Sequence, residues 1–341
     1  MKQILLIILM LAALSNIYAQ EEEEVVVVEE TTSPTISLSG SVDAYFRQNL
    51  GGDFDAAPGT SFANLPGFAL GMANLIGTVE TGKVGFVADL VYGPRGEDAT
   101  FASPFLRPGG SSNIVNQMYA YWNLSDKTTV TIGNFNTFLG YEVISPTGNF
   151  NYSTSYMFSY GPFSHTGLKF DFDLGGGFSI MTGIFNPTDA TEYNPTNKYV
   201  GGAQLGYDFG SGSAYLNTLF DGDFFQIDLT AGVDLSETLY LGVNATSASD
   251  NFSGAALYLQ AATSDAFKIG LRGEYFKDSG VGVIGDGENV FDLTITGNYV
   301  IDGLTIMPEI RLDAFSSDII PDGDDMKGSL SSFVLAVAYA F

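Results

Sequence analysis

Apolar and polar residues alternate with a period of two through most of the chain from Ile36 onward. The final segment shows this most clearly, because every second position from Phe333 to Phe341 is large and apolar while the positions between hold Val, Ala or Ser. Such alternation predicts strands rather than helices. Bulky faces suit lipid, and small or polar faces suit a water-filled interior, so the pattern predicts a closed transmembrane β-barrel. The alternative, a soluble sandwich, would leave the apolar last strand as an unprotected sheet edge.

The spacing of turn residues supports an all-β antiparallel barrel of about 16 strands, each about 8 to 13 residues long. Short turns are expected near Thr81-Gly82, Ser125-Asp126, Gly175-Gly176, Gly210-Ser211, Ser236-Glu237, Ser264-Asp265 and Asp302-Gly303. Longer connections are expected at residues 48–66, 94–113, 136–164, 186–197, 278–289 and 316–328. An even strand count places both termini on the periplasmic side. Phe341 must then pair with the first strand, near residues 36–46, to close the barrel.

The amino terminus has the pattern of a signal peptide over residues 1–19. Lys2 precedes a short apolar run at residues 4–14, and Ala19 precedes a plausible cleavage site. The run is too short for a spanning helix, which needs about 20 residues. Residues 20–34 form an acidic, low-complexity leader that is expected to be flexible, or alternatively to dock on another protein or enter the pore. Residues 35–341 then form the barrel, and the expected location is the outer membrane of a Gram-negative cell.

Composition narrows the classes of function. Hydrophobic residues make up 45% of the chain and charged residues only 15%, as expected for a barrel whose outer face meets lipid. The absence of Cys excludes disulfides and thiolate metal sites, and the single His excludes a site with two or more histidines. A net charge of −26 makes nucleic acid an improbable partner. No nucleophile-elbow motif is present, so we expect no catalytic residues, no metal and no cofactor.

The carboxyl terminus also carries an expected recognition signal for outer-membrane assembly. Tyr339 and Phe341 resemble the signal by which the bacterial outer-membrane assembly machinery recognises its clients. That machinery and the outer-membrane lipid are therefore expected partners.

The connection at residues 136–164 is unusually long for a loop without regular structure. It is rich in aromatic residues, Gly, Ser, Thr and Asn, and Glu142 is its only acid. Folding inward would bury the aromatic rings and narrow the pore, so Tyr141, Glu142, Tyr152 and the adjacent His165 are the candidates for a constriction. Glu142 is either a selectivity charge or an anchor to a lumenal Arg or Lys. His165 is either a pH-sensitive gate or metal ligand, or a structural hydrogen-bonding residue, and the last interpretation is favoured.

Inward positions of the expected strands carry charges of both signs. Arg272 with Asp292, and Asp292 with Arg311, are expected cross-strand neighbours. Together these side chains either shape the electric field in the pore or form a structural ladder of salt bridges, and both roles are compatible. The expected lumen-wall charges are Asp43, Arg47, Asp89, Lys268, Arg272, Glu274, Asp292, Glu309, Arg311 and Asp313.

The chain resembles a known family over about residues 36–341. The motifs are Gly133-Asn134-Phe135, Leu139-Gly140-Tyr141-Glu142, Asn149-Phe150-Asn151-Tyr152-Ser153, Gly161-Pro162-Phe163 and His165-Thr166-Gly167, with weaker runs at residues 272–276 and 309–311. These motifs resemble the putative beta-barrel porin-2 family, described as OmpL-like. The resemblance implies an outer-membrane channel whose substrates are mostly unassigned. Because porins often form trimers, it also suggests a homotrimer, which the sequence itself does not demonstrate.

The expected function is passive diffusion of small hydrophilic solutes through a lumen narrowed by the loop. The acidic balance favours cations. The alternative is a narrow or plugged barrel that acts as a surface binding or adhesion protein, with residues 101–108 and 319–325 as its contact loops. The acidic runs at residues 286–288 and 322–325 do not have EF-hand spacing, so solvated loops are expected rather than calcium sites.

Overall fold

The computed structural model describes residues 33–100, 111–191, 194 and 197–341. The expected signal peptide and most of the expected leader lie outside the described residues, as does the expected contact loop at 101–108.

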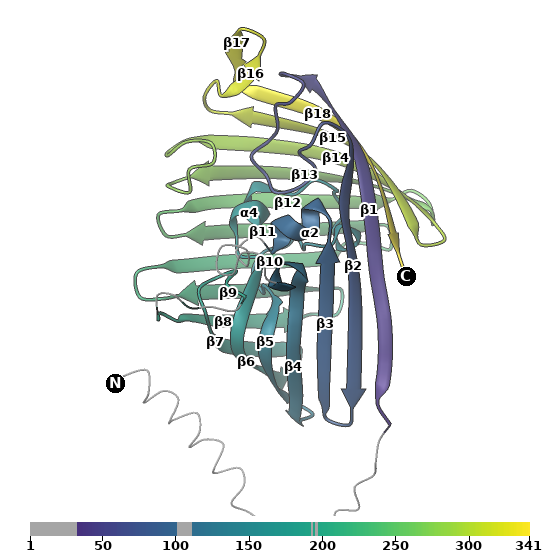
Figure 1. The fold of residues 1–341 in the computed structure, drawn as a ribbon, viewed down its shortest axis with the longest axis vertical. Helices are drawn as coiled ribbons and strands as arrows, with labels where there is room; N and C mark the ends of the chain where they lie inside the picture. The colour runs from purple at the N-terminus through teal and green to yellow at the C-terminus, as the bar shows by residue number, and fades with distance from the viewer. Residues whose placement is uncertain (1–32, 101–110, 192–193, 195–196) are drawn as a thin grey trace, which may run out of the picture. The chain divides into compact units, whose positions relative to one another are not determined.

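Sixteen strands of the described chain form one closed antiparallel barrel (Figure 1). Each strand pairs with its neighbours along the chain, and β18 pairs with both β15 and β1. The strands are β1 (Thr35–Gly51), β2 (Gly67–Thr81), β3 (Val84–Tyr92), β4 (Val115–Ser125), β5 (Thr128–Asn136), β6 (Ser164–Gly175), β7 (Phe178–Phe185), β8 (Val200–Asp208), β9 (Gly212–Phe220), β10 (Phe225–Asp234), β11 (Leu239–Ala248), β12 (Phe252–Ala262), β13 (Phe267–Asp278), β14 (Asn289–Ile301), β15 (Leu304–Phe315) and β18 (Ser329–Ala340). The sequence prediction of an all-β antiparallel barrel of this size is confirmed.

The carboxyl terminus closes the barrel as expected. Ser41 of β1 faces Ala340 of β18 in the ladder. Gly40 and Phe341 then exchange two backbone hydrogen bonds, each 3.1 Å between nitrogen and oxygen. Gly40 has no side chain, and a Cβ there would lie 3.1 Å from the Phe341 ring. The terminal residue is thus the last pairing position of the seam.

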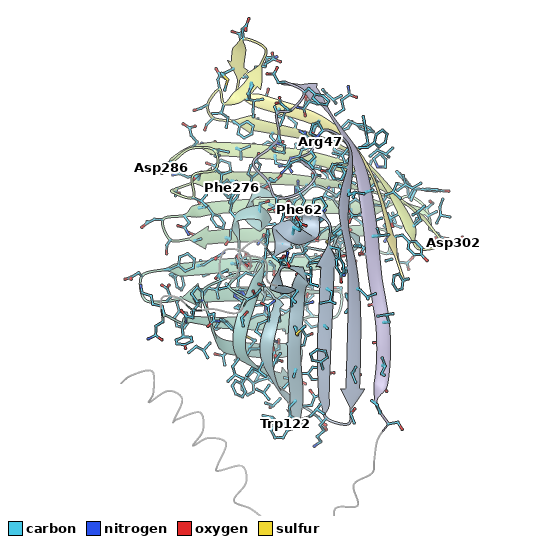
Figure 2. The ribbon with its side chains drawn as sticks, viewed as in Figure 1. Arg47, Phe62, Trp122, Phe276, Asp286 and Asp302 are labelled. Carbon is cyan, nitrogen blue, oxygen red and sulfur yellow. The ribbon has the colours of Figure 1, made fainter. Side chains whose placement is uncertain are left out.

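The period of two separates a lipid-type outer face from a packed interior. On β13, Leu271 and Tyr275 are exposed while the intervening Arg272 and Glu274 are fully buried inside. Exposed aromatic side chains lie near both ends of the strands, where interfacial aromatic belts are expected. Trp122 lies near the short turn that ends β4 (Figure 2). The short turns and the long connections lie at opposite ends of the strands, as the positions of Asp302 in a short turn and Asp286 in a long connection show (Figure 2). In the described ranges, no helix is long and apolar enough to cross a membrane.

All the expected short turns occur, while the longer connections contain structure that the sequence pattern did not predict. They hold α2 (Pro94–Ala99), η1 (Ser111–Ile114), η2 (Pro146–Gly148), α4 (Tyr156–Tyr160) and a hairpin of β16 (Ile320–Asp322) and β17 (Asp325–Lys327). These elements are too short to show a clear period. β1 also runs to Gly51, four residues into an expected connection, because Gln48, Asn49 and Gly51 still pair with β18.

The core lies inside the barrel, where side chains of the connections pack against inward-facing apolar residues of the strands. Phe62 from the first connection, Ala99 of α2, and Ile144, Phe158 and Phe163 from the connection between β5 and β6 form one apolar cluster with wall residues Met72 and Val91. The Arg95 guanidinium lies over the Phe62 ring, and its Nε donates to the Ile144 carbonyl oxygen at 2.9 Å. Several connections are therefore packed together within the lumen.

Candidate functional site

The segment between β5 and β6, residues 137–163, crosses the lumen and is called the lumen loop below. Two wall carboxylates hold its backbone. Glu309 accepts hydrogen bonds from the Tyr152 and Ser153 amides at 2.8 and 3.1 Å, and Glu274 accepts from the Tyr156 and Met157 amides, both at 2.8 Å. Both carboxylates are buried. Each side chain thus satisfies two backbone donors that would otherwise be unpaired inside the barrel.

A buried ion network fixes the same part of the loop. Arg272 donates through Nη1 to Glu142 Oε1 and to the Ser153 carbonyl oxygen, both at 2.7 Å, and its Nη2 lies 2.9 Å from Asp292 Oδ2. Arg311 lies 2.9 Å from the same Asp292 oxygen and 2.7 Å from Asp313 Oδ1. The cross-strand pairs expected from the sequence, Arg272 with Asp292 and Asp292 with Arg311, are therefore present. Because Glu142 faces Arg272 with almost no exposed surface, the structure favours its role as an anchor over its role as a selectivity charge.

Inward-facing glycines of the wall receive bulky side chains of the loop. A Cβ added to Gly242 would lie 2.5 Å from the Tyr141 hydroxyl, one on Gly270 would lie 2.2 Å from the Phe150 ring, and one on Gly254 would lie 2.7 Å from Met157. These glycines stand at inward positions of β11, β13 and β12. Their role in seating the loop was not predicted, although small residues at inward positions were a usable signal.

Tyr141 joins the loop to strands β11 and β12. Its ring stacks on Tyr258 with centroids 4.1 Å apart, and its hydroxyl donates to the Tyr240 hydroxyl at 3.0 Å. Burial raises the pKa of the Tyr141 phenol well above its usual range, so it stays a neutral donor. It also lines a cavity of about 700 Å³ in the lumen.

Tyr152 and His165 are fully buried, so neither presents a surface to that cavity. Tyr152 donates from its hydroxyl to Asp43 on β1. His165 Nε2 lies 3.0 Å from the Thr137 hydroxyl, and the imidazole packs against the rings of Phe138 and Phe185. This environment fits the favoured interpretation of His165 as a structural residue. Any effect of either side chain on solute passage would act through the position of the loop.

The remaining predicted wall charges have different surroundings. Arg47 donates to the Ala56 carbonyl oxygen at 3.1 Å and thereby holds the first connection. Asp89 accepts from Asn116 at 2.6 Å. Lys268 is exposed and lines a smaller lumenal cavity. The predicted charges thus divide into a buried set, bonded to connections or to neighbouring strands, and an exposed residue, Lys268, that faces the lumen.

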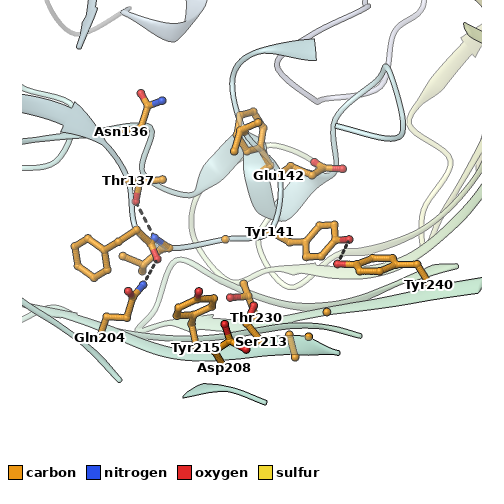
Figure 3. A pocket seen from close by; sticks show the side chains of 18 of the residues that line it. Asn136, Thr137, Tyr141, Glu142, Gln204, Asp208, Ser213, Tyr215, Thr230 and Tyr240 are labelled. Carbon is orange, nitrogen blue, oxygen red and sulfur yellow. Dashed lines mark hydrogen bonds between the residues drawn. The ribbon is translucent and has the colours of Figure 1, made fainter. Parts of the chain in front are cut away.

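A cavity of about 700 Å³ lies between the lumen loop and the wall of β8–β11. The start of the loop, residues 137–144, forms one side. Figure 3 shows Tyr215, Ser213, Thr230 and Asp208 on the opposite side. Gln204, Asp234 and Tyr240 also line the cavity on this wall. None of these wall residues was a predicted site residue, although each occupies an inward position of the alternation.

The described residues contain no cluster of three or more His, Cys, Asp or Glu side chains arranged to hold a metal ion. The arrangement is instead that of a lumen with an anchored inner loop and a cavity lined by polar and aromatic residues beside it.

A family model described as putative beta-barrel porin-2, OmpL-like, matches residues 35–341. The chain belongs to this family. The resemblance expected from the sequence motifs is therefore confirmed, and the protein is a porin with transmembrane β-strands.

Solved structures with the same fold are porins and outer-membrane proteins of low sequence similarity. Salmonella typhi OmpF, solved in complex with daunomycin, has a TM-score of 0.60 at 11% identity and covers 90% of this chain and 97% of its own. OmpT of Vibrio cholerae in a trimer form has a TM-score of 0.56 at 11% identity, covering 91% and 100%. A mutant of the Rh. blastica porin has a TM-score of 0.52 at 13% identity, covering 91% and 100%. No curated protein matches the chain.

Proposed function

We propose that this porin lets small hydrophilic solutes diffuse passively across the outer membrane, through a lumen that the inner loop narrows. The observation that carries the proposal is the asymmetric position of the lumen loop. Residues 142–157 are tied to β13, β14 and β15 by buried carboxylates and arginines. On the other side, the loop is held by a hydrogen bond from the Gly140 amide to Asp228 and one from Gln204 to the Phe138 carbonyl oxygen, and a cavity of about 700 Å³ is left between it and β8–β11. Solute would pass on the β8–β11 side. Membership of a porin family and a porin fold support a channel rather than an enzyme.

We also propose a preference for cations. Arg272 and Arg311 are buried in ion pairs, so their charge is compensated and withheld from water. Asp173, Asp208 and Asp234 stand at inward positions of three periplasmic hairpins and are exposed. Lys268 on the opposite wall offsets one of these charges. The exposed balance of these groups is acidic, which lowers the energy of a cation at the pore mouth.

Planar-bilayer conductance under a salt gradient tests both parts. The expected result is stepwise single-channel current with a cation-selective reversal potential, reduced toward zero by the double change Asp208→Asn and Asp234→Asn. Asp318→Asn, in an external connection, is the matched control and should leave the reversal potential unchanged. An anion-selective potential in the wild-type protein would contradict the proposed preference.

The second candidate function is a narrow barrel that binds a partner at the cell surface. It is favoured by the apolar packing of several connections inside the lumen, which leaves less room for solute. The β16–β17 hairpin, which includes much of the expected contact region 319–325, is its best-placed surface element. No channel openings, together with retained binding to cells or particles, would favour this function over diffusion.

Membership of the family also supports an assembly proposal. Insertion would depend on Tyr339 and Phe341 as the recognition signal for the assembly machinery. The protein would then form a homotrimer in the lipid of the outer membrane. Chemical crosslinking in native membranes, followed by denaturing electrophoresis, would give a trimer band if this is correct and only monomer if it is not.

A further inference from the structure

Two tyrosines of the large cavity lie against inward-facing glycines of neighbouring strands. A Cβ on Gly206 would come within 3.0 Å of the Tyr215 ring, and a Cβ on Gly232 would come within 2.0 Å of the Tyr240 hydroxyl. Any larger residue at these positions would push the rings away from the wall. Because both tyrosines line the cavity and keep exposed surface, the glycines let the rings lie along the wall as aromatic platforms.

The spacing of the platforms suits a ligand of one or two rings. Tyr215 is on β9 and Tyr240 on β11, so β10 runs between them and the two strands are about 10 Å apart. The ladder pairs Tyr215 with Thr230, and it pairs Tyr240 with Asp234. A hydroxyl and a carboxylate therefore lie beside the platforms. The cavity volume of about 700 Å³ is in the range of small-molecule sites.

The other polar groups of the cavity are uncharged except for Asp208 and for Glu142, which is paired with Arg272. Gln204 and Ser213 add an amide and a hydroxyl on the wall. On the loop side, the buried Asn136 Oδ1 has no hydrogen-bond partner among the described residues. Among the described residues, no Lys or Arg lines the cavity, which disfavours phosphate or carboxylate ligands.

We infer that this cavity is a subsite for a neutral saccharide of one or two rings. The C–H faces of a pyranose ring are apolar and stack on the tyrosine rings, while its hydroxyls exchange hydrogen bonds with Gln204, Ser213, Thr230 and Asp234. The subsite lies on the passage beside the lumen loop, so a bound sugar obstructs the current of small ions. The inference rests on the proposed diffusion function and names a substrate class for it.

The test is the block of single-channel current by maltose in planar bilayers, with glycerol as the control for viscosity. Maltose should reduce the current in a saturable manner, and glycerol should not. Combining Tyr215→Leu with Tyr240→Leu removes both platforms and should raise the half-blocking concentration about tenfold, because loss of about 1.4 kcal/mol of binding changes the dissociation constant by that factor. Tyr275→Leu, on the lipid-facing side of β13, is the matched control and should leave the block unchanged.

The outcomes separate this inference from the proposed function. Conducting channels without a maltose block, or a block that the double variant leaves unaltered, would overturn the saccharide subsite. A block by choline but not by maltose would also overturn it and would assign a cation site instead. If the double variant fails to insert, Thr230→Val keeps the side-chain shape and should raise the half-blocking concentration by about threefold, near the loss of one hydrogen bond. If the wild type does not conduct, diffusion is refuted, and titration calorimetry of maltose into the detergent-solubilised protein decides the subsite alone.

Discussion

The ion network between the wall and the lumen loop can be tested by Arg272→Met. The Arg272 side chain has no exposed surface and contacts Glu142 Oε1, Asp292 Oδ2 and the Ser153 carbonyl oxygen at 2.7 to 2.9 Å. Met fills a similar volume but donates no hydrogen bond. Asp292 keeps Arg311, so the group left without a counter-ion is Glu142 on the loop.

Removing one member of a buried ion pair costs about 3–5 kcal/mol, because the remaining charge stays desolvated. The strand ladder does not depend on Arg272, so the cost should appear as easier detachment of the loop. Amides that exchange by this local opening should exchange at least about a hundredfold faster, since each 1.4 kcal/mol is a factor of ten. The amides concerned are those of residues 152–157, which bond to Glu309, Glu142 and Glu274.

Hydrogen exchange measured by mass spectrometry on the inserted protein gives the readout. Lys268→Met is the control, because Lys268 is an exposed lumenal cation outside this network. Adding Glu142→Gln to Arg272→Met removes the orphaned charge and should restore part of the protection. If exchange at residues 152–157 rises by less than about threefold in an inserted Arg272→Met variant, the ion pairs do not hold the loop and the reasoning is wrong.

Three further predictions follow from the loop and the barrel seam. Gly242→Ala places a Cβ 2.5 Å from the Tyr141 hydroxyl and should destabilise the docked loop by about 1–3 kcal/mol, measured by hydrogen exchange. Gly273→Ala is the control and should have no such effect, because a Cβ at Gly273 would lie 4.0 Å from the Phe291 ring. Glu309→Gln keeps the shape but weakens the acceptor of the Tyr152 and Ser153 amides, so the single-channel current of the variant should become noisier as the loop fluctuates. A variant trace as steady as that of the wild type would argue against this anchor. Deletion of Phe341 removes the last pairing position of the seam and should reduce the amount of the heat-modifiable, inserted form on electrophoresis. If the truncated protein inserts normally and only its conductance changes, the residue acts in conductance rather than in assembly.

Much of the barrel could be predicted because its determinants are local. Alternation within a strand such as β13 needs only the residues of that strand, and the short turns show themselves by Gly, Asp and Ser at their tips. The pairing of Phe341 with the first strand followed from closure, since an even number of antiparallel strands allows no other seam. The short α2, α4 and the β16–β17 hairpin escaped prediction because each is too brief to show a period and depends on packing against distant parts of the chain.

The site was less predictable because its contacts join residues far apart in sequence. Glu142 meets Arg272 across 130 positions, and Tyr152 meets Glu309 across 157. A pattern of residue types marks Arg272 and Glu309 as inward charges but cannot say which loop atoms they bind. The cavity residues Gln204, Tyr215 and Tyr240 were inward positions like many others until the loop was placed beside them.

The sequence by itself thus determined the strands, their faces, the turns and the closing seam, because the period of two and the turn chemistry act over a few residues. It also marked residues 136–164 as a segment with too many aromatic side chains to lie in water. Only the tertiary structure decided which wall the loop binds, through carboxylates and glycines on β11–β15, and hence on which side a passage is left. That choice depends on burial and on pairing across the lumen, which arise only after the barrel has closed.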